Sequence, residues 1–210
     1  MKKTKILSLS ILLVFLSLNA QKESNSKQPS FEVNIGRSFA GTGDTWGYQF
    51  GFTYTEVITK KLNWFVGLEG SLHDEEGDVL IFDDPNGNTI NSTLYDVTGG
   101  IQLLGGVRYN FIQNTHHNLG LSLGGVFRYQ ASSVNDYIET IFPILTDYPV
   151  PVRVIINETK QRTYSPGGVF KVQYNYKFNN KYLLGLTAGI QNDTNEDIIS
   201  FFTLGFGFML

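Results

Sequence analysis

The chain has 210 residues, 41% of them hydrophobic, with many glycines (22), phenylalanines (16) and tyrosines (11), which fits one domain. It contains no cysteine, which excludes disulfides and thiolate chemistry. Without the three lysines of the leader described next, 13 of the 16 basic residues remain against 19 acidic ones, a net charge near −6 that argues against a nucleic-acid partner.

The first 20 residues have the pattern of a secretory signal peptide. Three lysines form a positively charged start, Ile6 to Leu18 form an apolar stretch, and Ala20 ends a candidate cleavage site. The stretch is too short for a lasting anchor, and no later apolar run has the 18 or more residues that a spanning helix needs. We therefore expect a cleaved leader over 1–20 and a short polar lead-in over 21–30.

Eight later segments alternate between large apolar residues and small or polar residues. A period of two predicts β-strands with one apolar face and one small or polar face. The last segment shows this best, because Phe202, Leu204, Phe206, Phe208 and Leu210 alternate with Thr203, Gly205, Gly207 and Met209. The predicted strands span residues 31–40, 45–58, 62–72, 94–111, 118–131, 162–178, 181–191 and 201–210.

The connections between these strands alternate in a way that predicts the topology. Residues 59–61, 112–117 and 179–180 form short turns, whereas the long connections, 73–93 and 132–161, fall at the other end. Bacterial barrels have an even number of strands, short periplasmic turns and longer extracellular loops. The sequence thus predicts an all-β fold, an eight-stranded antiparallel up-and-down transmembrane β-barrel over 31–210, with both termini periplasmic.

The division of charge between the two strand faces indicates which face meets lipid. A soluble lipocalin-like barrel, also eight-stranded, turns its aliphatic face inward and its charged face outward. Here the polar face is mostly Gly, Ser, Thr, Gln and Asn, which suits a narrow, filled interior. A secreted soluble ligand-binding barrel is the alternative. One residue breaks the pattern: Arg37 has lipid-facing parity, so we expect it either near the outer interface or re-aimed by a bulge after Gly36.

The interior of an eight-stranded barrel is only wide enough for side chains. Six polar residues share the inward parity and are candidate interior residues: Glu32, Glu69, Arg108, Arg128, Lys171 and Gln173. Because an isolated buried charge is costly, we expect these residues to form a network of ion pairs and hydrogen bonds that fills the barrel. A narrow, charge-lined pore is the alternative.

The connection over 73–93 is acidic. Its carboxylates are Asp74, Glu75, Glu76, Asp78, Asp83 and Asp84. Hard oxygen ligands of this kind bind Ca²⁺ in proteins, but the spacing is not that of an EF-hand, so we expect a solvated loop and treat the six as weak metal candidates. No cofactor is expected. The segment Asp84 to Asn88 predicts a turn.

The connection over 132–161 contains two β-prone arms around a proline-bearing turn, which predicts a hairpin. Such an edge can bind a protein partner by strand addition. The candidate contact residues are Tyr137, Ile141, Phe142 and Tyr148. The hairpin either protrudes above the membrane or folds back over the barrel mouth.

Nothing in the chain predicts an enzyme. Its only histidines are His73, His116 and His117, and it has no nucleophile elbow, P-loop or zincin signature.

Taken together, the leader, the eight strands and the aromatic-rich final strand resemble two groups of small outer-membrane β-barrels. These are the OmpX and OmpA-transmembrane type and the PorT-like proteins of Bacteroidetes. The resemblance implies a monomer in the outer membrane, in contact with lipid, whose segment Phe202 to Leu210 is recognised by the barrel assembly machinery. The chain departs from the pattern of these proteins because its last strand ends on Leu210 rather than on an aromatic residue. The implied function is envelope integrity, adhesion or partner binding through extracellular loops. The alternative is a narrow channel or a component of a secretion or gliding apparatus.

Overall fold

The computed structural model describes residues 28–41, 45–76, 81–83, 89–91, 95–133, 137–141, 152–156, 162–195 and 198–210. Eight long strands form the barrel: β1 (Ser30–Ala40), β2 (Thr45–Val57), β3 (Leu62–Glu76), β6 (Tyr95–Gln113), β7 (His117–Ser132), β10 (Arg162–Phe178), β11 (Tyr182–Asp193) and β12 (Ile198–Met209). Four short strands form two hairpins: β4 (Ile81–Asp83) with β5 (Thr89–Asn91), and β8 (Tyr137–Ile141) with β9 (Val152–Ile156).

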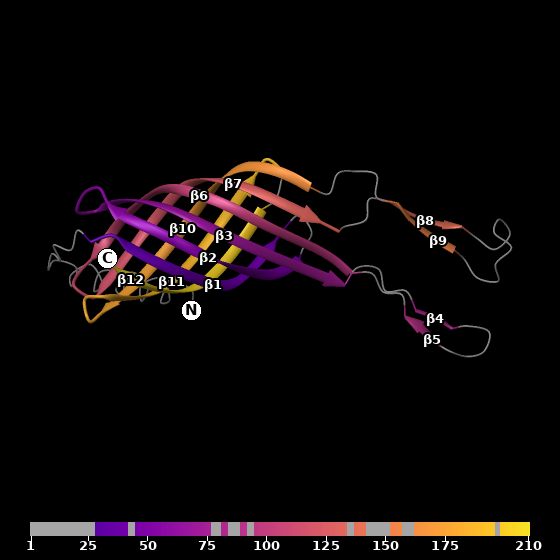
Figure 1. Ribbon diagram of the computed structural model, residues 1–210, viewed down its shortest axis with the longest axis horizontal. Helices are drawn as coiled ribbons and strands as arrows, with labels where there is room; N and C mark the ends of the chain where they lie inside the picture. Colours follow the sequence, from indigo (N-terminus) through magenta and orange to yellow (C-terminus); the bar gives the residue numbers. More distant parts are fainter. Residues whose placement is uncertain are drawn as a thin grey trace, which may run out of the picture.

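The eight long strands close into a barrel in the order β1-β12-β11-β10-β7-β6-β3-β2 (Figure 1). Closure occurs between the first and last strands, which pair antiparallel from Ser30 opposite Met209 to Ala40 opposite Ile199. The other barrel pairs are also antiparallel. The predicted eight-stranded antiparallel barrel is therefore confirmed. The described part of the chain contains no helix with the length and apolarity to cross a membrane.

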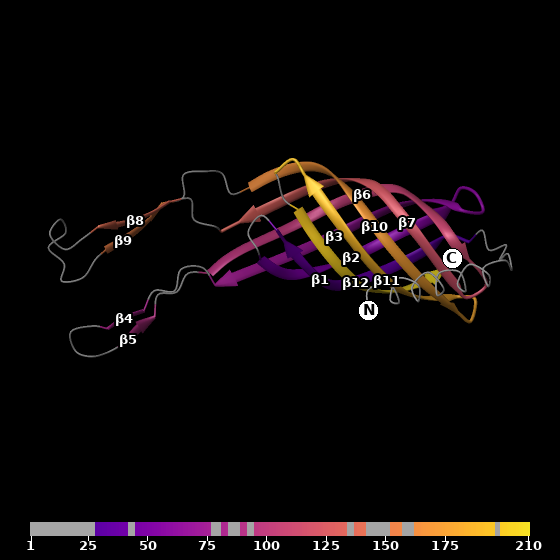
Figure 2. The same ribbon diagram turned by 180° about the vertical axis from the view of Figure 1, so that it is seen from behind.

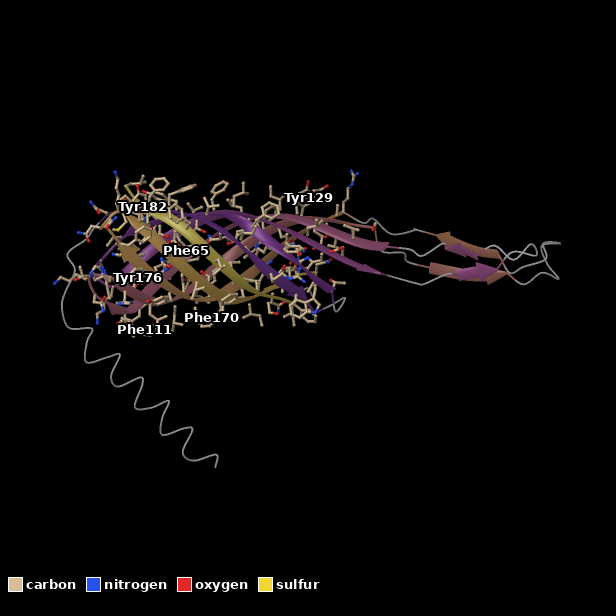
Figure 3. The ribbon with its side chains drawn as sticks, turned by 90° about the horizontal axis from the view of Figure 1, so that it is seen from below. Phe65, Phe111, Tyr129, Phe170, Tyr176 and Tyr182 are labelled. Carbon is tan, nitrogen blue, oxygen red and sulfur yellow. The ribbon has the colours of Figure 1, made fainter. Side chains whose placement is uncertain are left out.

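The alternation seen in the sequence becomes an outer and an inner face. In β12, Leu204 is 58% exposed whereas its neighbour Thr203 is 5% exposed. The same division holds around the barrel, as Figure 3 illustrates with Phe111 and Phe170 on the outside. Large apolar side chains thus cover the outside, and the small and polar ones point inward.

One end of the barrel carries the three short turns, 58–61, 114–116 and 179–181, and we call it the turn end. The turn between β10 and β11 shows why such a short connection is possible. Asn179 and Asn180 both have a φ of 51°, and the N–H of Lys181 donates to the carbonyl of Phe178 (3.2 Å). Asparagine tolerates positive φ better than most residues and so suits a tight hairpin turn.

At the opposite end, which we call the hairpin end, the acidic connection differs from the prediction. β3 continues beyond residue 72 to Glu76, and its final residues pair with the start of β6, Glu76 standing opposite Tyr95. Consequently Asp74, Glu75 and Glu76 belong to a barrel strand rather than to a loop. The ladder continues because backbone pairing depends on the neighbouring strand and not on the polarity of the side chains.

Both hairpins lie beyond the hairpin end, away from the end near the C-terminus (Figures 1 and 2). β8 and β9 pair antiparallel, from Tyr137 opposite Ile156 to Ile141 opposite Val152, so the predicted hairpin is confirmed. The predicted turn over 84–88 lies outside the described residues, although the pair Asp83–Thr89 flanks it. The leader predicted over 1–20 also lies outside them.

Candidate functional site in the barrel interior

The interior contains two carboxylate-centred clusters, and Glu69 is the centre of the first. Its Oε1 accepts a hydrogen bond from Lys171 Nζ at 2.7 Å, and its Oε2 accepts from Gln49 Nε2 at 2.6 Å and from Gln102 Nε2 at 3.0 Å. Gln191 Nε2 then donates to the side-chain oxygen Oε1 of Gln102 (2.9 Å). These five residues come from five strands, so this cluster ties together much of the barrel wall.

Glu32 is the centre of the second cluster. Its Oε2 accepts from Gln173 Nε2 at 2.9 Å, and its Oε1 accepts from Asn175 Nδ2 at 3.0 Å. Arg108 Nη1 lies 4.0 Å from Glu32 Oε1, and Arg108 also donates to the side chains of Gln173 and Ser122. The buried charge of Glu32 is therefore matched by a guanidinium and two amides.

A third pair lies nearer the hairpin end, where Arg128 Nη1 is 3.4 Å from Asp193 Oδ2. Both side chains are buried. Of the six candidate interior residues, the structure brings Glu32, Arg108 and Gln173 together, and it joins Glu69 to Lys171. Arg128 belongs to neither cluster and pairs instead with Asp193, a residue that the sequence did not single out.

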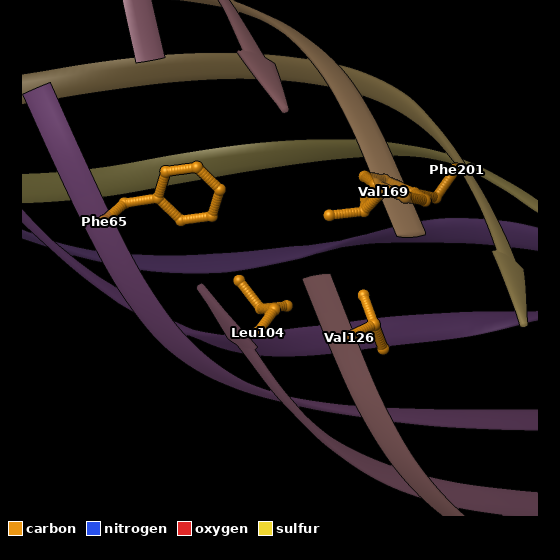
Figure 4. Packing of buried hydrophobic residues seen from close by; sticks show 5 residues of the cluster. All are labelled: Phe65, Leu104, Val126, Val169 and Phe201. Carbon is orange, nitrogen blue, oxygen red and sulfur yellow. The ribbon is translucent and has the colours of Figure 1, made fainter. Parts of the chain in front are cut away.

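An apolar cluster completes the filling of the barrel. It consists of Phe65, Leu104, Val126, Val169 and Phe201, all with side chains inside the wall (Figure 4). Lys171 Nζ lies 6.0 Å from the centre of the Phe65 ring and 5.4 Å from that of Phe201, so the ammonium of the first cluster also faces aromatic rings. Alternation in the sequence predicts that Phe65, Leu104 and Val126 point inward, but no local pattern predicts that they meet in one cluster.

Little free space remains between these groups. Where Glu69, Lys171 and Arg108 face one another, a cavity leaves about 10 Å³ open to the centres of water molecules. A second cavity, at the turn end, leaves about 30 Å³. Since one water needs about 10–15 Å³ on this measure, the first cavity has room for about one water and the second for about two.

Ser38 and His73 form a contact that the sequence did not predict. Ser38 Oγ and His73 Nε2 are 3.0 Å apart, and both side chains are almost fully buried. Ser38 stands opposite Gly47 on β2, which in turn stands opposite His73 on β3. The missing side chain at Gly47 leaves the space through which the imidazole reaches Ser38. The sequence feature that could have predicted this contact is the inward parity that Ser38 and His73 share with Gly47, the glycine that lies between them in the sheet.

On the outer face, Arg37 lies against two aromatic rings. Its guanidinium carbon is 4.4 Å from the centre of the Tyr48 ring and 5.8 Å from that of Trp46. The registers of β1 with both neighbours are continuous, so no bulge re-aims Arg37. It points outward near the hairpin end of β1, stabilised by cation–π contacts.

Aromatic residues gather near both ends of the outer surface. Tyr129 and Tyr164 lie near the hairpin end, with ring centres 4.9 Å apart. Phe178 and Tyr182 lie at the turn end, with ring centres 5.3 Å apart. Such girdles are typical of the two membrane–water interfaces of a transmembrane barrel.

The structure describes the remaining candidates only in part. Asp74 is exposed on β3, and the described residues contain no group of three or more His, Asp or Glu side chains able to hold a metal. Only the backbone is described at Glu75, Glu76 and Asp83, and at Tyr137 and Ile141 of β8. Asp78, Asp84, Phe142 and Tyr148 lie outside the described residues.

Comparison with known proteins identifies the fold but no family. No family model and no curated protein matches the sequence. Among solved structures, the barrel resembles Neisserial surface protein A with a TM-score of 0.55 and 7% identity, covering 88% of this chain and 98% of that one. Weaker similarities are to Ail of Yersinia pestis (TM-score 0.49, 9% identity, 87% and 99% covered) and the N-terminal barrel domain of Pseudomonas aeruginosa OprF (0.45, 11%, 87% and 98%). The chain thus has the fold of the small eight-stranded outer-membrane β-barrels.

Proposed function

We propose that this chain is a small, non-enzymatic outer-membrane β-barrel that acts through the two hairpins at its hairpin end. The observation that carries the proposal is the filled interior, in which ion pairs, amides and an apolar cluster of the described residues surround two cavities with room for only a few waters. A barrel closed in this way offers its lumen neither to a substrate nor to a diffusing solute.

The outer surface supports the membrane location. Leu123 is 65% exposed and Ile35 is 63% exposed, and many other large apolar residues of the barrel are similarly exposed. Monomeric soluble proteins rarely expose apolar patches beyond a few hundred Å². A lipid bilayer would shield such a surface from water. An apolar band about 25 Å tall between aromatic girdles is typical of outer-membrane barrels. The predicted signal peptide supplies the export that this location requires.

The lengths of the connections support an orientation. Outer-membrane barrels have short turns on the periplasmic side and longer loops outside. The hairpins β4–β5 and β8–β9 then extend outside the cell, and both ends of the barrel sequence lie in the periplasm. The barrel assembly machinery would then recognise the segment Phe202 to Leu210 from the periplasm, as the resemblance implies.

The hairpins are suited to binding a protein partner. Each is a two-stranded sheet whose outer edges pair with no other strand among the described residues. An unpaired edge can accept a strand from another chain, with backbone hydrogen bonds giving affinity. We therefore assign the binding role to the hairpins, and above all to β8–β9, which has the longer edge.

Cysteine labelling of intact cells tests the orientation cleanly, because the natural chain has no cysteine. Thr89→Cys places a thiol on the β4–β5 hairpin, and Asn180→Cys places one in a short turn. A membrane-impermeant maleimide should label the first variant on intact cells and the second only after the outer membrane is opened. Labelling of Asn180→Cys on intact cells would contradict the proposed orientation.

Planar-bilayer recording tests the closed lumen. The folded full-length barrel should insert without producing discrete conductance steps, because the ion pairs and apolar cluster interrupt any water path. Regular conductance steps that change in size when Lys171 is replaced by Met would instead establish the narrow channel.

A further inference from the structure

The buried charges that the structure describes inside the barrel do not balance. Among the described residues, four buried cations and three buried carboxylates face the interior: Arg108, Arg128, Lys171 and Lys177, with Glu32, Glu69 and Asp193. The three carboxylates each pair with one cation, as described above. Lys177 is the cation that remains, and within the described part of the chain its ammonium has no hydrogen bond or ion pair.

Lys177 is held firmly in place at the turn end of β10. It is 7% exposed and stands opposite Leu183 of β11 in the barrel register. Its backbone N–H donates to the carbonyl of His116 at 2.6 Å, and its own carbonyl lies 3.1 Å from His116 Nδ1. The lysine backbone is therefore fixed, and the side chain lines the 30 Å³ cavity at this end.

The lining of that cavity is positive and rich in donors. Besides Lys177 it includes Arg108, the hydroxyl of Thr55 and the amides of Asn63 and Asn118, whereas the Asn175 amide group, which also lines it, already donates to Glu32. No carboxylate is among the described lining residues. Arg108 shares its charge with Glu32, 4.0 Å away, so Lys177 supplies the uncompensated charge.

A second observation points into the same cavity. Thr55 is 4% exposed, yet its Oγ1 has no hydrogen-bond partner. Buried polar atoms normally have partners. An unpartnered hydroxyl and an unpaired ammonium beside one small cavity are both explained by one occupant that accepts hydrogen bonds and carries negative charge.

We propose that the turn-end cavity binds a small monovalent anion of halide size, held by the ammonium of Lys177 with help from the Thr55 hydroxyl and the surrounding amides. An ammonium that is withdrawn in part from water without a counter-charge is costly, and an anion in contact with it offsets that cost. The cavity admits about two waters, which favours a halide over phosphate or an organic acid. This site is independent of the hairpins and therefore of the proposed binding function.

Chloride-35 NMR of the full-length, detergent-folded barrel tests the site, with chloride itself as the probe. Bound chloride exchanging with free chloride broadens the resonance, and the excess linewidth should fall towards that of free chloride as bromide competes for the site. Lys177→Met keeps the apolar stem and removes the charge, so it should abolish the competable broadening. Lys181→Met, at an exposed lysine in the adjacent turn, is the matched control and should keep it.

Retention of the broadening in Lys177→Met, or equal loss in both variants, would overturn the assignment. If Lys177→Met does not fold, crystals of the unaltered protein soaked in bromide decide the question. An anomalous peak beside Lys177 Nζ supports the site, and a cavity without anomalous signal rejects it.

Discussion

The two faces of the same strands follow opposite rules. On β12, Leu204 is 58% exposed outside while Thr203, one residue earlier, is 5% exposed inside. A soluble barrel would reverse this arrangement. In the proposed membrane location two separate forces hold the molecule together: contact with lipid stabilises the outer face, and paired charges and amides stabilise the inner one.

The inner face depends on specific partners in a way that the outer face does not. Lys171 and Glu69 are 102 residues apart in sequence and meet only when the barrel is closed. A buried carboxylate without its partner would be costly, whereas one outward apolar residue can replace another against lipid. Four substitutions, in order of expected effect, test this contrast.

The largest effect is expected from Glu69→Gln. It leaves the Lys171 ammonium buried without a counter-charge, which should lower the free energy of unfolding by about 3–5 kcal/mol. Urea unfolding in lipid vesicles measures it. The exposed Glu56→Gln is the control and should change stability by less than about 0.5 kcal/mol. Combining Glu69→Gln with Lys171→Met should restore much of the loss, and no restoration would show that the ion pair is not the cause.

On the outer face, Leu204→Arg places a charge near the middle of the lipid-facing surface. We expect it to lower the free energy of unfolding by about 2–4 kcal/mol, whereas an arginine near an interface lowers it by about 0–1 kcal/mol. Phe208→Arg, near the turn end of the same strand, is the matched control. Equal costs at the two positions in the same vesicles would argue against a bilayer around the barrel.

Gly47→Ala tests the packing of Ser38 against His73. A Cβ at Gly47 would lie 2.5 Å from His73 Cδ2 and would also collide with the backbone oxygen of Leu72, so the wall itself would have to shift. We expect a loss of about 1–3 kcal/mol, as for other overpacked sites. Gly99→Ala, whose Cβ would meet only Leu72 Cδ1 at 3.9 Å, should be nearly neutral. Urea midpoints that coincide for the two variants would refute this packing.

The smallest effect is expected at Arg37. Because Arg37 lies near the hairpin end, beside Tyr48 and Trp46, it costs little in lipid and gains cation–π contacts of about 0.5–1 kcal/mol. Arg37→Leu should therefore change the free energy of unfolding by no more than about 1 kcal/mol. A large stabilisation by leucine would show that Arg37 sits deep in the bilayer.

The sequence predicted the strands and their faces, because a period of two is a local property. It predicted less well where strands end: Asp74, Glu75 and Glu76 resembled a loop, yet their backbones pair with β6. The stagger between distant strands decides which inward residues meet, and no local pattern encodes it. The alternation along each strand thus predicts that Glu69 and Lys171 point inward, but it does not predict that they pair with each other. The roles of Ser38 with His73 and of Lys177 at the turn-end cavity were missed for the same reason.

The proposed membrane location requires the apolar face of each strand to meet lipid and the polar face to avoid it. Nitroxide scanning of β12 tests this requirement, using single cysteines at positions 200 to 208 in the naturally cysteine-free chain, folded into lipid vesicles. Accessibility to oxygen, which concentrates in lipid, should alternate with a period of two and peak at Phe202, Leu204 and Phe206. Uniform accessibility, or maxima at Thr203 and Gly205, would contradict the account.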